Sequence, residues 1–496
     1  MLIKKDPDII KAYLEDSSNL KGGYAKEVVI PSTIEELSAF VKEANREGNP
    51  LTISGGGTGT TGSRIPFGGA VISMEKFNRI LGISEKEPSC ALQTGVLVDD
   101  LKRAAEQKGL FYTSHPTERT ASVGGTVATN ASGSRSFKYG PTRGYVNRLK
   151  MVLANGEVFE VVRGQRMLKR DDSRVELAGG GKIIVPLPTY KIPKIKNSAG
   201  YFAKDGMDLI DLFIGQEGTL SIIVDMDLGL ARAPRGILSS FVFFRKEEDA
   251  WAFSDEARRT SKAKRLDDSP GLDALSIEYF DSNALRILAF KDSNVPRDAH
   301  AAIFFEQETS PETEDVLTHG WLEIISRHNA SLDNTWAAMN EKEQGRFAEL
   351  RHYIPEWIND SLRKEGAQKF ATDIAVPEDS FSEMMNFYKD TLMGSCIEHV
   401  IFGHIGECHV HVNLLPKSED ERAKAKEMLK RFIKKGVLLG GTVSAEHGIG
   451  KTKHEYLEIM YGASGVMEMA RIKKAFDPAC ILGLDNIFPK ALLRLA

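Results

Sequence analysis

A run of glycines that no helix can follow is the feature that most constrains the fold. Residues 55–62 read GGGTGTTG and follow a short apolar stretch, 51–54, that is typical of a β-strand. The run contains G-x-G-x-x-G, the pattern of a nicotinamide-dinucleotide site, but that site needs a helix directly after the glycines. Pro66 and the glycine pair 68–69 come next and cannot continue a helix. The sequence therefore excludes a Rossmann fold at this loop.

The same run suits an anion held by the backbone. Successive residues without a Cβ let several N–H groups converge on one anion, and the threonines add hydroxyl donors. A pyrophosphate is the natural guest, and an ordinary turn-rich loop is the alternative. A second candidate, the Gly-Lys-Thr at 450–452, lacks the first glycine of a P-loop because Ala445 stands there.

Bulk properties indicate an ordinary enzyme of two or three domains, because 496 residues exceed the size of one hydrophobic core. A net charge of −4 gives no reason to expect a nucleic-acid partner. The four cysteines form no C-x-x-C pair, which argues against a disulfide scaffold, a structural zinc or an iron–sulfur cluster. The first residues lack the apolar core of a signal peptide, and no stretch approaches the ~20 apolar residues of a membrane span. We expect a cytoplasmic enzyme, either free or peripheral at the inner face of the membrane.

Local patterns predict an α+β chain with a change of character near residue 235. Thr33 and Glu36 form a capping box that opens a helix, and its apolar stripe ends at Gly48. Residues 164–195 are polar and then rich in Gly and Pro, which predicts an irregular insertion. After residue 235, apolar strands alternate with amphipathic helices, which indicates a second α+β domain. These strands are expected at 238–244, 274–279 and 301–305.

Three of the eleven histidines fall within eight residues, at His404, His409 and His411. The alternation over 409–414 has the period of a strand, which places His411 and Asn413 on one face. A turn at Gly406 must then bring His404 around. With Glu446 as an oxygen ligand, two imidazoles and a carboxylate suit zinc or manganese and leave positions open for catalysis. A lone histidine is more often a surface or hydrogen-bonded core residue, but the cluster favours a metal.

Several separated motifs occur in order and carry a family resemblance. They are VVIPSTIEE at 28–36, the glycine run, ASVGGTVATNA at 121–131, YGPTR at 139–143, IGQEGTL at 214–220, GHIGE at 403–407, SAEHGIG at 444–450 and FDPACIL at 476–482. Together they resemble the FAD-binding flavoproteins of the vanillyl-alcohol-oxidase type, in the branch of D-lactate dehydrogenases and glycolate oxidase catalytic subunits. The resemblance runs from about residue 25 to about residue 490.

The resemblance implies an α+β architecture in which a two-subdomain FAD-binding domain precedes an α+β cap domain and a C-terminal helical segment. We expect a helical extension over 1–25 and the FAD-binding domain over 26–234, with the insertion at 164–195. The cap, or substrate, domain over 235–440 would carry the first metal histidines. The segment 441–496 would return to the flavin.

The resemblance also implies an FAD site. The pyrophosphate would lie at Gly55, Gly56, Gly57, Thr58 and Gly59; the isoalloxazine and ribityl chain along His115, Pro116, Gly124, Gly125, Asn130, Gly133 and Gly140; and the adenine side at Gly215, Glu217 and Gly218. Some members attach FAD to a histidine in the glycine loop or to a downstream cysteine. Here 55–62 holds no histidine, and 113–145 holds only His115 and no cysteine, so we infer non-covalent FAD.

For catalysis, the resemblance implies a metal held by His404, His411 and Glu446 and a general base at His447. Arg351 matches an arginine that binds the substrate carboxylate, although a solvated helix arginine is an equal alternative. Asn413 completes the predicted catalytic set. The implied reaction oxidises a small D-2-hydroxy acid of the lactate or glycolate type to the 2-keto acid by hydride transfer to flavin, with metal-assisted removal of the hydroxyl proton.

The chain also departs from the family pattern. Where the family commonly reads G-H-x-G-D-G-N-x-H, this sequence has Glu407, Cys408 and His409 in place of D-G-N. Cys408 and His409 are both potential ligands, so the change could retune the metal, make its occupancy variable or only reshape the pocket. Residues 482–486 replace the family L-N-P-G-K, so the contact of that asparagine does not carry over. Ala371 stands where some relatives have a substrate-binding lysine, which disfavours a bulky diacid substrate.

Reduced flavin must pass its electrons on, and we expect an electron-accepting partner protein, a quinone or a soluble carrier. The cations Arg166, Lys169, Arg170, Lys191, Lys194 and Lys196 form a candidate docking surface, for which a solvated loop is the alternative. A homodimer and a hetero-complex both remain open. Two rival functions are a same-fold flavoprotein with another alcohol substrate and a non-catalytic FAD-binding electron-transfer subunit.

Overall fold

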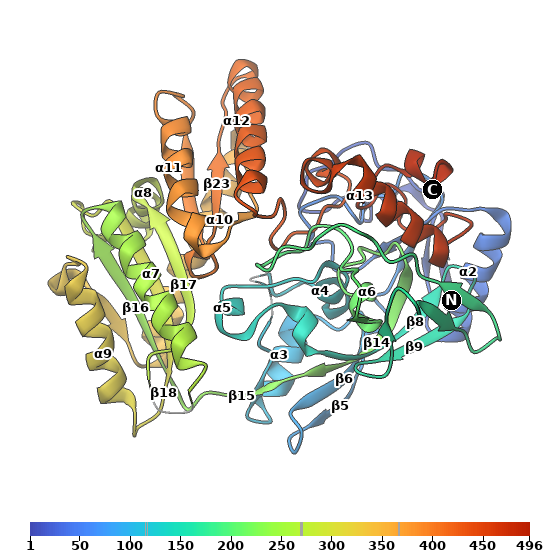
Figure 1. Ribbon diagram of the computed structural model, residues 1–496, viewed down its shortest axis with the longest axis horizontal. Helices are drawn as coiled ribbons and strands as arrows, with labels where there is room; N and C mark the ends of the chain where they lie inside the picture. Colours follow the sequence, from blue (N-terminus) through green and yellow to red (C-terminus); the bar gives the residue numbers. More distant parts are fainter. Residues whose placement is uncertain (115, 117, 268–270, 366–367) are drawn as a thin grey trace. The chain divides into compact units, whose positions relative to one another are not determined.

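The computed structural model describes residues 1–114, 116, 118–267, 271–365 and 368–496 (Figure 1). The chain forms two compact units. The first unit comprises Met1–Gly133, Gly140–Ala233 and Ser444–Ala496, and the second comprises Ser134–Tyr139 and Pro234–Val443. Among the described residues, every helix is too short or too polar to cross a membrane.

A four-stranded sheet opens the first unit. Its strands are ordered β1 (Leu2–Lys4), β2 (Glu27–Ile30), β4 (Ala70–Ser73) and β3 (Leu51–Ser54), and the last three run parallel. Helix α2 (Ile34–Glu47) begins as predicted, because the Thr33 hydroxyl accepts a hydrogen bond from the Glu36 N–H at 3.2 Å. It ends at Gly48, whose φ of 66° is in the left-handed region. Its apolar stripe is buried in the core beneath the sheet.

A second, antiparallel sheet shares that core. Its order is β5 (Ile80–Ser84), β6 (Ser89–Gln93), β14 (Ser221–Gly229), β8 (Val146–Leu153) and β9 (Val158–Val162). Val152 of β8 and Ile222 of β14 lie in the same hydrophobic cluster as the buried side chains of α2. The two sheets therefore pack as parts of one unit.

The last residues of the chain join this core through a backbone turn after α13 (His454–Phe476). The buried Asp477 carboxylate accepts hydrogen bonds from the N–H groups of Ile481 and Leu482, at 2.9 Å and 2.8 Å. It also forms an ion pair with Lys473 at 2.6 Å. The Leu51 N–H in β3 then donates to the Ile481 carbonyl at 2.7 Å. This turn seats the end of the chain against the strand that leads into the glycine loop.

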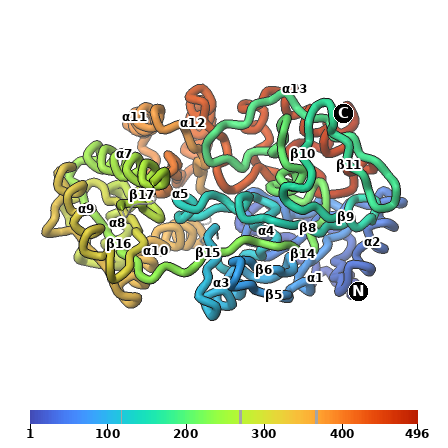
Figure 2. The backbone as a smooth tube through the Cα atoms, turned by 60° about the horizontal axis from the view of Figure 1, so that its bottom comes forward, coloured from blue at the N-terminus to red at the C-terminus, as the bar shows by residue number. Residues whose placement is uncertain are grey.

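The predicted insertion at 164–195 is irregular apart from the short strands β10 (Met167–Leu168), β11 (Arg174–Glu176) and β12 (Lys182–Ile184). Figure 2 shows this stretch passing on the same side of the first unit as α13. The contact is direct, because the Thr189 hydroxyl donates to Glu468 of α13 at 2.8 Å and Tyr190 packs on Tyr461. The insertion thus covers a helix of its own unit.

An eight-stranded antiparallel sheet forms the second unit. Along its main path the order is β19 (Trp336–Ala338), β16 (Gly236–Phe244), β18 (Ala301–Thr309), β17 (Ala274–Asp281), β22 (His399–Gly403), β23 (His409–Leu414) and β20 (Phe370–Ala371), and β21 (Ile374–Ala375) also pairs with β23. The three strands predicted after residue 235 are β16, β17 and β18, so that prediction is confirmed.

Helices cover both faces of this sheet. Successive residues of a strand point to opposite faces, so neighbouring side chains contact different helices. Phe304 of β18 packs in the cluster with α8 (Ser282–Lys291) and α10 (Glu341–Glu365). Its neighbour Phe305 packs on Trp321 of α9 (Glu314–Arg327) and on Phe253 of α7 (Glu247–Lys264). Helices α11 (Phe381–Leu392) and α12 (Glu419–Leu438) meet through Tyr388 and Phe432. The unit is a helix–sheet–helix sandwich, in keeping with the α+β class predicted from the sequence.

A hexapeptide from the first half of the chain belongs to this second unit. Ser134–Tyr139 contains the short helix α5 (Ser136–Tyr139), which lies against β17. The Arg135 guanidinium donates twice to the Glu306 carboxylate, each at 2.9 Å, and Lys138 pairs with Glu308 at 2.8 Å. These buried and half-buried ion pairs fix the hexapeptide to the sheet.

Candidate active site

The loop after β3 presents bare backbone. Residues 55–69, all of them described, contain no helix, which confirms that the Rossmann pattern is misleading here. Gly55 and Gly56 are exposed, yet a Cβ on Gly55 would lie 2.4 Å from Ser122 Oγ and one on Gly56 would lie 2.6 Å from the Thr120 carbonyl oxygen. Gly57 has a φ of 76°, whereas Gly59 faces open space. The glycines therefore allow two loops to meet and leave N–H groups at the surface.

The second predicted motif supplies the other side of that contact. Helix α4 (Val123–Thr129) begins at Ser122, whose hydroxyl accepts from the Gly125 N–H at 3.3 Å, and ends at Asn130 with a φ of 51°. A Cβ on Gly124 would lie 1.6 Å from Thr94 Oγ1, so only glycine fits there. Asn130 Oδ1 accepts from the Arg143 N–H at 3.0 Å, which ties this helix to the YGPTR motif.

The remaining predicted FAD residues surround the same helix. The N–H groups of Gly215 and Glu217 donate to the carbonyls of Val127 and Ala128, at 3.0 Å and 2.8 Å. The Gly140 carbonyl accepts from Ser114 Oγ at 3.0 Å. His115 lies outside the described residues. The structure thus brings motifs separated by many residues to α4, in a region rich in glycine and small side chains.

Glu217 has a partner that the sequence did not reveal. Its buried carboxylate accepts from the N–H groups of Ile449 and Gly450, at 2.8 Å and 2.7 Å, and from Ser63 Oγ at 2.7 Å. Burial raises the pKa of this carboxyl group, and the hydrogen bonds partly offset the rise. Glu217 therefore fastens the 444–450 motif to the glycine loop, while its predicted adenine role stays a prediction.

Residues 482–486, where the family contact did not carry over, make a contact of their own. The Asn486 side-chain amide donates to the Ser63 carbonyl at 3.1 Å and to the Glu217 carbonyl at 2.8 Å. Its oxygen accepts from Lys451 Nζ. Asn486 thereby supports the same junction as Glu217, a role without any local sequence signal.

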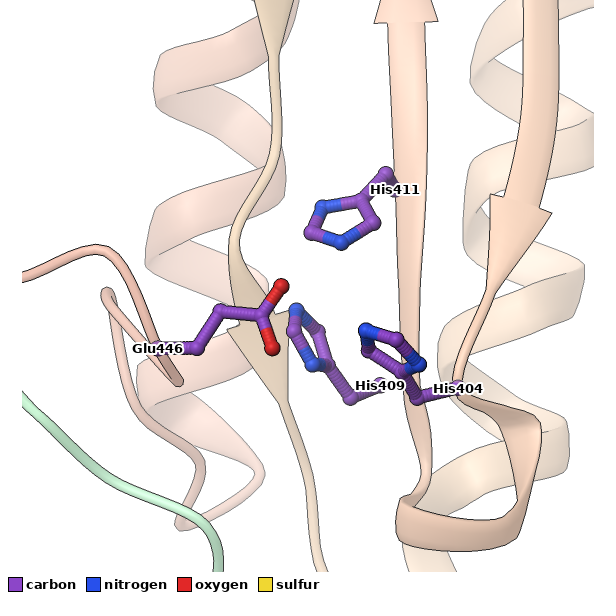
Figure 3. A group of neighbouring side chains, drawn as sticks. All are labelled: His404, His409, His411 and Glu446. Atoms are coloured by element: carbon purple, nitrogen blue, oxygen red, sulfur yellow. The ribbon is translucent and has the colours of Figure 1, made fainter. Parts of the chain in front are cut away.

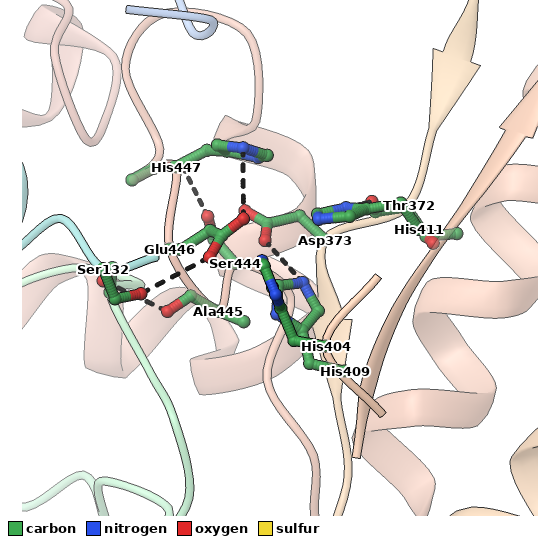
Figure 4. Close-up of polar contacts among 12 residues, drawn as sticks. Ser132, Thr372, Asp373, His404, His409, His411, Ser444, Ala445, Glu446 and His447 are labelled. Carbon is green, nitrogen blue, oxygen red and sulfur yellow. Dashed lines mark hydrogen bonds and ion pairs between the residues drawn. The ribbon is translucent and has the colours of Figure 1, made fainter. Parts of the chain in front are cut away.

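Glu446 and His447 lie on the loop that Glu217 holds (Figure 4). Glu446 Oε2 is 2.9 Å from Lys196 Nζ and accepts from Ser132 Oγ at 3.4 Å, while Oε1 is 3.6 Å from His447 Nε2. The Lys196 side chain is only 3% exposed, so its expected place on a docking surface is wrong. It neutralises Glu446 instead, since a buried carboxylate needs a partner.

In the second unit, a tight turn brings three imidazoles together (Figure 3). β22 ends at Gly403, the 3-10 turn Ile405–Glu407 follows, and Cys408 enters β23 with a φ of 53°. A left-handed φ favours glycine, which accounts for the family glycine at that position. The ring centroids of His409 and His411 are 4.5 Å apart, and those of His404 lie 5.4 Å and 5.8 Å from them. The predicted strand over 409–414 is confirmed.

An oxygen lies behind each ring of this histidine cluster. His404 Nδ1 is 2.6 Å from Glu278 Oε1, His411 Nδ1 is 3.0 Å from the Thr372 carbonyl, and His409 Nε2 is 3.2 Å from Asp373 Oδ1. A carbonyl or carboxylate accepts the Nδ1–H of His404 and His411, which leaves the lone pair on Nε2. This is the arrangement that orients metal-binding histidines, so the residues present fit a divalent ion.

Arg351 is joined to the cluster through Glu278. Its Nε and Nη2 both donate to Glu278 Oε2, at 3.0 Å and 2.8 Å, while Oε1 of the same carboxylate contacts His404. Burial alone would raise the pKa of Glu278, but the charge of Arg351 and the hydrogen bonds from Arg351 and His404 outweigh it and lower the pKa to about 2. Glu278 therefore stays ionised and fixes both side chains. No sequence motif points to this residue.

The predicted residue Asn413 lies on β23, and Cys408 directly precedes that strand. The Asn413 amide donates to the carbonyls of His411 and Val400, at 3.3 Å and 3.4 Å, so it braces β22 against β23. Burial raises the pKa of the Cys408 thiol to about 12. Among the described residues, the ligand-type atoms that gather here include those of His409 and exclude the Cys408 sulfur.

Comparison with known proteins decides the family. Residues 25–161 match the FAD binding domain family, and residues 250–484 match the C-terminal domain of FAD linked oxidases. The D-lactate dehydrogenase of Archaeoglobus fulgidus is 31% identical over 466 residues, which cover 93% of this chain and 91% of that protein. The chain belongs to the FAD-linked oxidase family. It is therefore an FAD-dependent oxidoreductase, and the family resemblance drawn from the motifs is confirmed.

Two other relatives of this FAD-linked oxidase match over nearly their full lengths. Glycolate oxidase subunit GlcD of Bacillus subtilis is 27% identical, with 93% of this chain and 89% of that protein covered. The D-2-hydroxyglutarate dehydrogenase of Stutzerimonas stutzeri is 28% identical, with 97% and 95% covered.

Solved structures confirm the expected fold. 4-Ethylphenol oxidase from Gulosibacter chungangensis aligns with a TM-score of 0.71 at 17% identity, covering 99% of this chain and 95% of that one. Alkyldihydroxyacetonephosphate synthase aligns with a TM-score of 0.67 at 14% identity, covering 97% and 81%. At these identities the likeness concerns the fold alone, which is the vanillyl-alcohol-oxidase-type FAD-binding fold that the motifs implied.

Proposed function

We propose that this FAD-linked oxidase binds its cofactor non-covalently and oxidises a small D-2-hydroxy acid, of lactate or glycolate size, to the 2-keto acid. The observation that carries the proposal is the histidine cluster joined through Glu278 to Arg351, since it pairs metal-binding side chains with a group suited to a carboxylate. The names of the relatives refer to lactate, glycolate and 2-hydroxyglutarate. Each of these compounds has a hydroxyl group next to a carboxylate.

The cofactor residues are proposed on the motifs that meet around α4. Gly55, Gly56, Gly57, Thr58 and Gly59 would bind the pyrophosphate through backbone N–H groups, and the residues of 115–140 and 215–218 predicted from the motifs would take the rest of the FAD. When bound, FAD supplies the hydride acceptor. The glycine loop holds no histidine and 113–145 no cysteine, which supports a non-covalent link.

The proton chemistry is proposed for the residues that the family resemblance assigns. His404 and His411, with Glu446 assigned on the family resemblance, would hold zinc or manganese. A divalent ion bound to the substrate hydroxyl lowers the pKa of that hydroxyl. His447 would accept the proton, and the Glu446 carboxylate 3.6 Å from its Nε2 can stabilise the resulting imidazolium.

Arg351 is proposed to bind the substrate carboxylate. Its guanidinium is 14% exposed and held on one edge by Glu278, which argues against the solvated alternative. A guanidinium fixed in this way binds a carboxylate without first losing side-chain freedom. Asn413 would act beside it by holding the His411 strand in register. Ala371, in place of a lysine, favours lactate or glycolate over a diacid.

Electrons are proposed to leave for a partner protein or a quinone. The cations of the 164–195 stretch give this docking idea little support. Arg166 pairs with Asp172 at 2.7 Å and Arg170 donates to the Pro188 carbonyl at 2.8 Å, both within the stretch itself. A solvated loop therefore describes these cations better than a docking surface, and the acceptor has to be found by assay.

A turnover panel with an artificial electron acceptor tests the substrate class. D-lactate, glycolate, L-lactate and D-2-hydroxyglutarate would be compared with an alkylphenol and an aldonolactone, the substrates expected of same-fold rivals. The proposal predicts the highest kcat/KM for D-lactate or glycolate. Preference for the phenol or the lactone would contradict it, and a complete absence of turnover with every compound would favour an electron-transfer subunit.

A further inference from the structure

The second unit carries three imidazoles where the family pattern supplies two. His404 and His411 match family positions, whereas His409 stands where the pattern has asparagine. The His409 side chain is fully buried, and its ring centroid is 4.5 Å from that of His411 and 5.4 Å from that of His404. One ring nitrogen of each of the three comes within 4.8 Å of those of the other two. Ligand atoms at such separations can reach one ion with small side-chain shifts.

We infer that His409 is a third nitrogen ligand of the metal, so that His404, His409 and His411 hold zinc through three imidazoles. This inference rests on the proposed function for the presence of a metal and goes beyond it in ligand number and metal identity. The three histidines all belong to the second unit. The metal's affinity is then set mainly by that unit.

The backbone explains why three rings can converge. His409 and His411 are two apart in β23, so both side chains leave the same face of the strand. The turn at Ile405–Glu407 folds His404 back, and the His409 N–H donates to the His404 carbonyl at 3.2 Å. Gly403 makes room, because a Cβ there would lie 3.0 Å from Cδ2 of the His411 ring.

The oxygens behind the rings support ligation by all three. Glu278 and the Thr372 carbonyl accept from Nδ1 of His404 and His411, and Asp373 lies 3.2 Å from Nε2 of His409. The carboxylate of Asp373 beside His409 is thus the counterpart of the oxygens beside His404 and His411, an arrangement typical of metal-binding imidazoles. Metal sites built from three imidazoles and an open position are characteristic of zinc, whereas manganese prefers oxygen ligands.

X-ray absorption spectroscopy at the zinc edge of the FAD-loaded full chain counts the imidazoles directly. Three are expected in the wild type, and two in His409→Asn, which restores the family residue. In a chelator competition, zinc affinity should fall more than about a hundredfold, the upper end of what losing an outer partner costs. His399→Asn is the matched control, since His399 lies on β22 with its Nδ1 toward the Ile397 carbonyl, and it should still show three.

The outcomes separate this inference from the proposed function. Two imidazoles in the wild type would overturn the inference and leave the proposed metal in place. A wild type that binds neither zinc nor manganese, by elemental analysis after loading with each, would overturn both. The wild-type count does not depend on any variant folding, and the flavin spectrum of His409→Asn shows whether that variant is intact.

Discussion

The glycine loop after β3 and the histidine strand β23 are built to hold their ligands by different means. The loop offers backbone N–H groups, and its first three glycines, Gly55, Gly56 and Gly57, let other segments approach closely. The strand offers side chains, and these are oriented by Glu278, Thr372 and Asp373 from other parts of the second unit. The loop should therefore bind its ligand after a change of side-chain charge but lose it when a side chain is enlarged. The strand should be more sensitive to a change of side-chain charge than to a change of side-chain size.

The difference also separates two functions. Backbone groups bind a phosphate at any ordinary pH, which suits a cofactor that stays bound through every turnover. Imidazoles and carboxylates change charge, which suits proton removal. Substitutions in the glycine loop and in the histidine cluster should therefore impair FAD binding and catalysis independently.

His404→Ala should give the largest effect, and this effect should be on the rate of flavin reduction alone. Loss of the metal and of the ring that Glu278 orients should slow flavin reduction by at least about a thousandfold, since polarising a hydroxyl is worth several kcal/mol. FAD content should not change. Rapid-mixing absorbance gives the rate, and His399→Ala on the neighbouring strand is the control. Reduction at the wild-type rate in His404→Ala would remove the cluster from the mechanism.

Gly56→Ala should damage the other region by adding one methyl group. The new Cβ would lie 2.6 Å from the Thr120 carbonyl oxygen, so the loop has to move. Crowding of this kind costs about 1–3 kcal/mol, or roughly 5- to 140-fold in FAD affinity. Fluorescence titration of the apoprotein measures it.

Gly59→Ala separates crowding of the cofactor from crowding within the protein, because its Cβ would meet no protein atom within 4 Å. The apoprotein should melt at the wild-type temperature, while FAD affinity falls because only the bound pyrophosphate is crowded. An unchanged FAD affinity in Gly59→Ala would mean that the run is needed for loop packing and not for the cofactor.

Lys196→Met should give an intermediate effect on turnover. Lys196 Nζ lies 2.9 Å from Glu446 Oε2 and the pair is nearly buried, so its removal leaves the carboxylate without this cation. Losing such a supporting partner typically costs 10- to 100-fold, and we expect about tenfold in kcat with FAD binding intact. The exposed Lys194→Met is the matched control from the same stretch. Equal kcat in the two variants would show that Lys196 has no part in positioning Glu446.

The smallest effect concerns stability in the second unit. Burial raises the pKa of Asp281, the residue that caps α8, to about 7, although Lys389 partly opposes the rise. The folded protein binds this proton more tightly than the unfolded chain, so stability should fall as pH rises from about 4 to about 7, by at most about 1.4 kcal/mol per pH unit.

Asp281→Asn keeps the cap and removes the proton site, so it should flatten that part of the pH profile. Urea unfolding of wild type and variant across this pH range measures the difference. Parallel profiles for the two proteins would exclude Asp281 as the source of the slope.

Elements with a local cause could be predicted from the sequence. Helix α2 carries its cap and its terminal glycine within its own residues, and β23 shows its period directly. The missing helix after the glycine run follows from Pro66 and the two glycines after it. In each case the signal lies within a few residues, where backbone preference decides the structure.

Contacts between distant segments could not be predicted. Glu278 precedes His404 by 126 residues, and an ionised glutamate in an apolar strand gives no sign of its partners. Lys196 resembles the other cations near the insertion, yet it is buried against Glu446. The Glu217 carboxylate holds the 444–450 loop through its backbone N–H groups, and the Asn486 amide donates to the Glu217 carbonyl, contacts that no motif records. These positions depend on tertiary packing, which spacing along the chain does not encode.

Anaerobic mixing of the oxidised holoenzyme with D-lactate or glycolate, followed by its visible flavin spectrum, tests the central claim most directly. The account predicts that one of these acids bleaches the flavin bands in a single turnover while L-lactate leaves them unchanged. A flavin that stays oxidised with both acids would contradict the account.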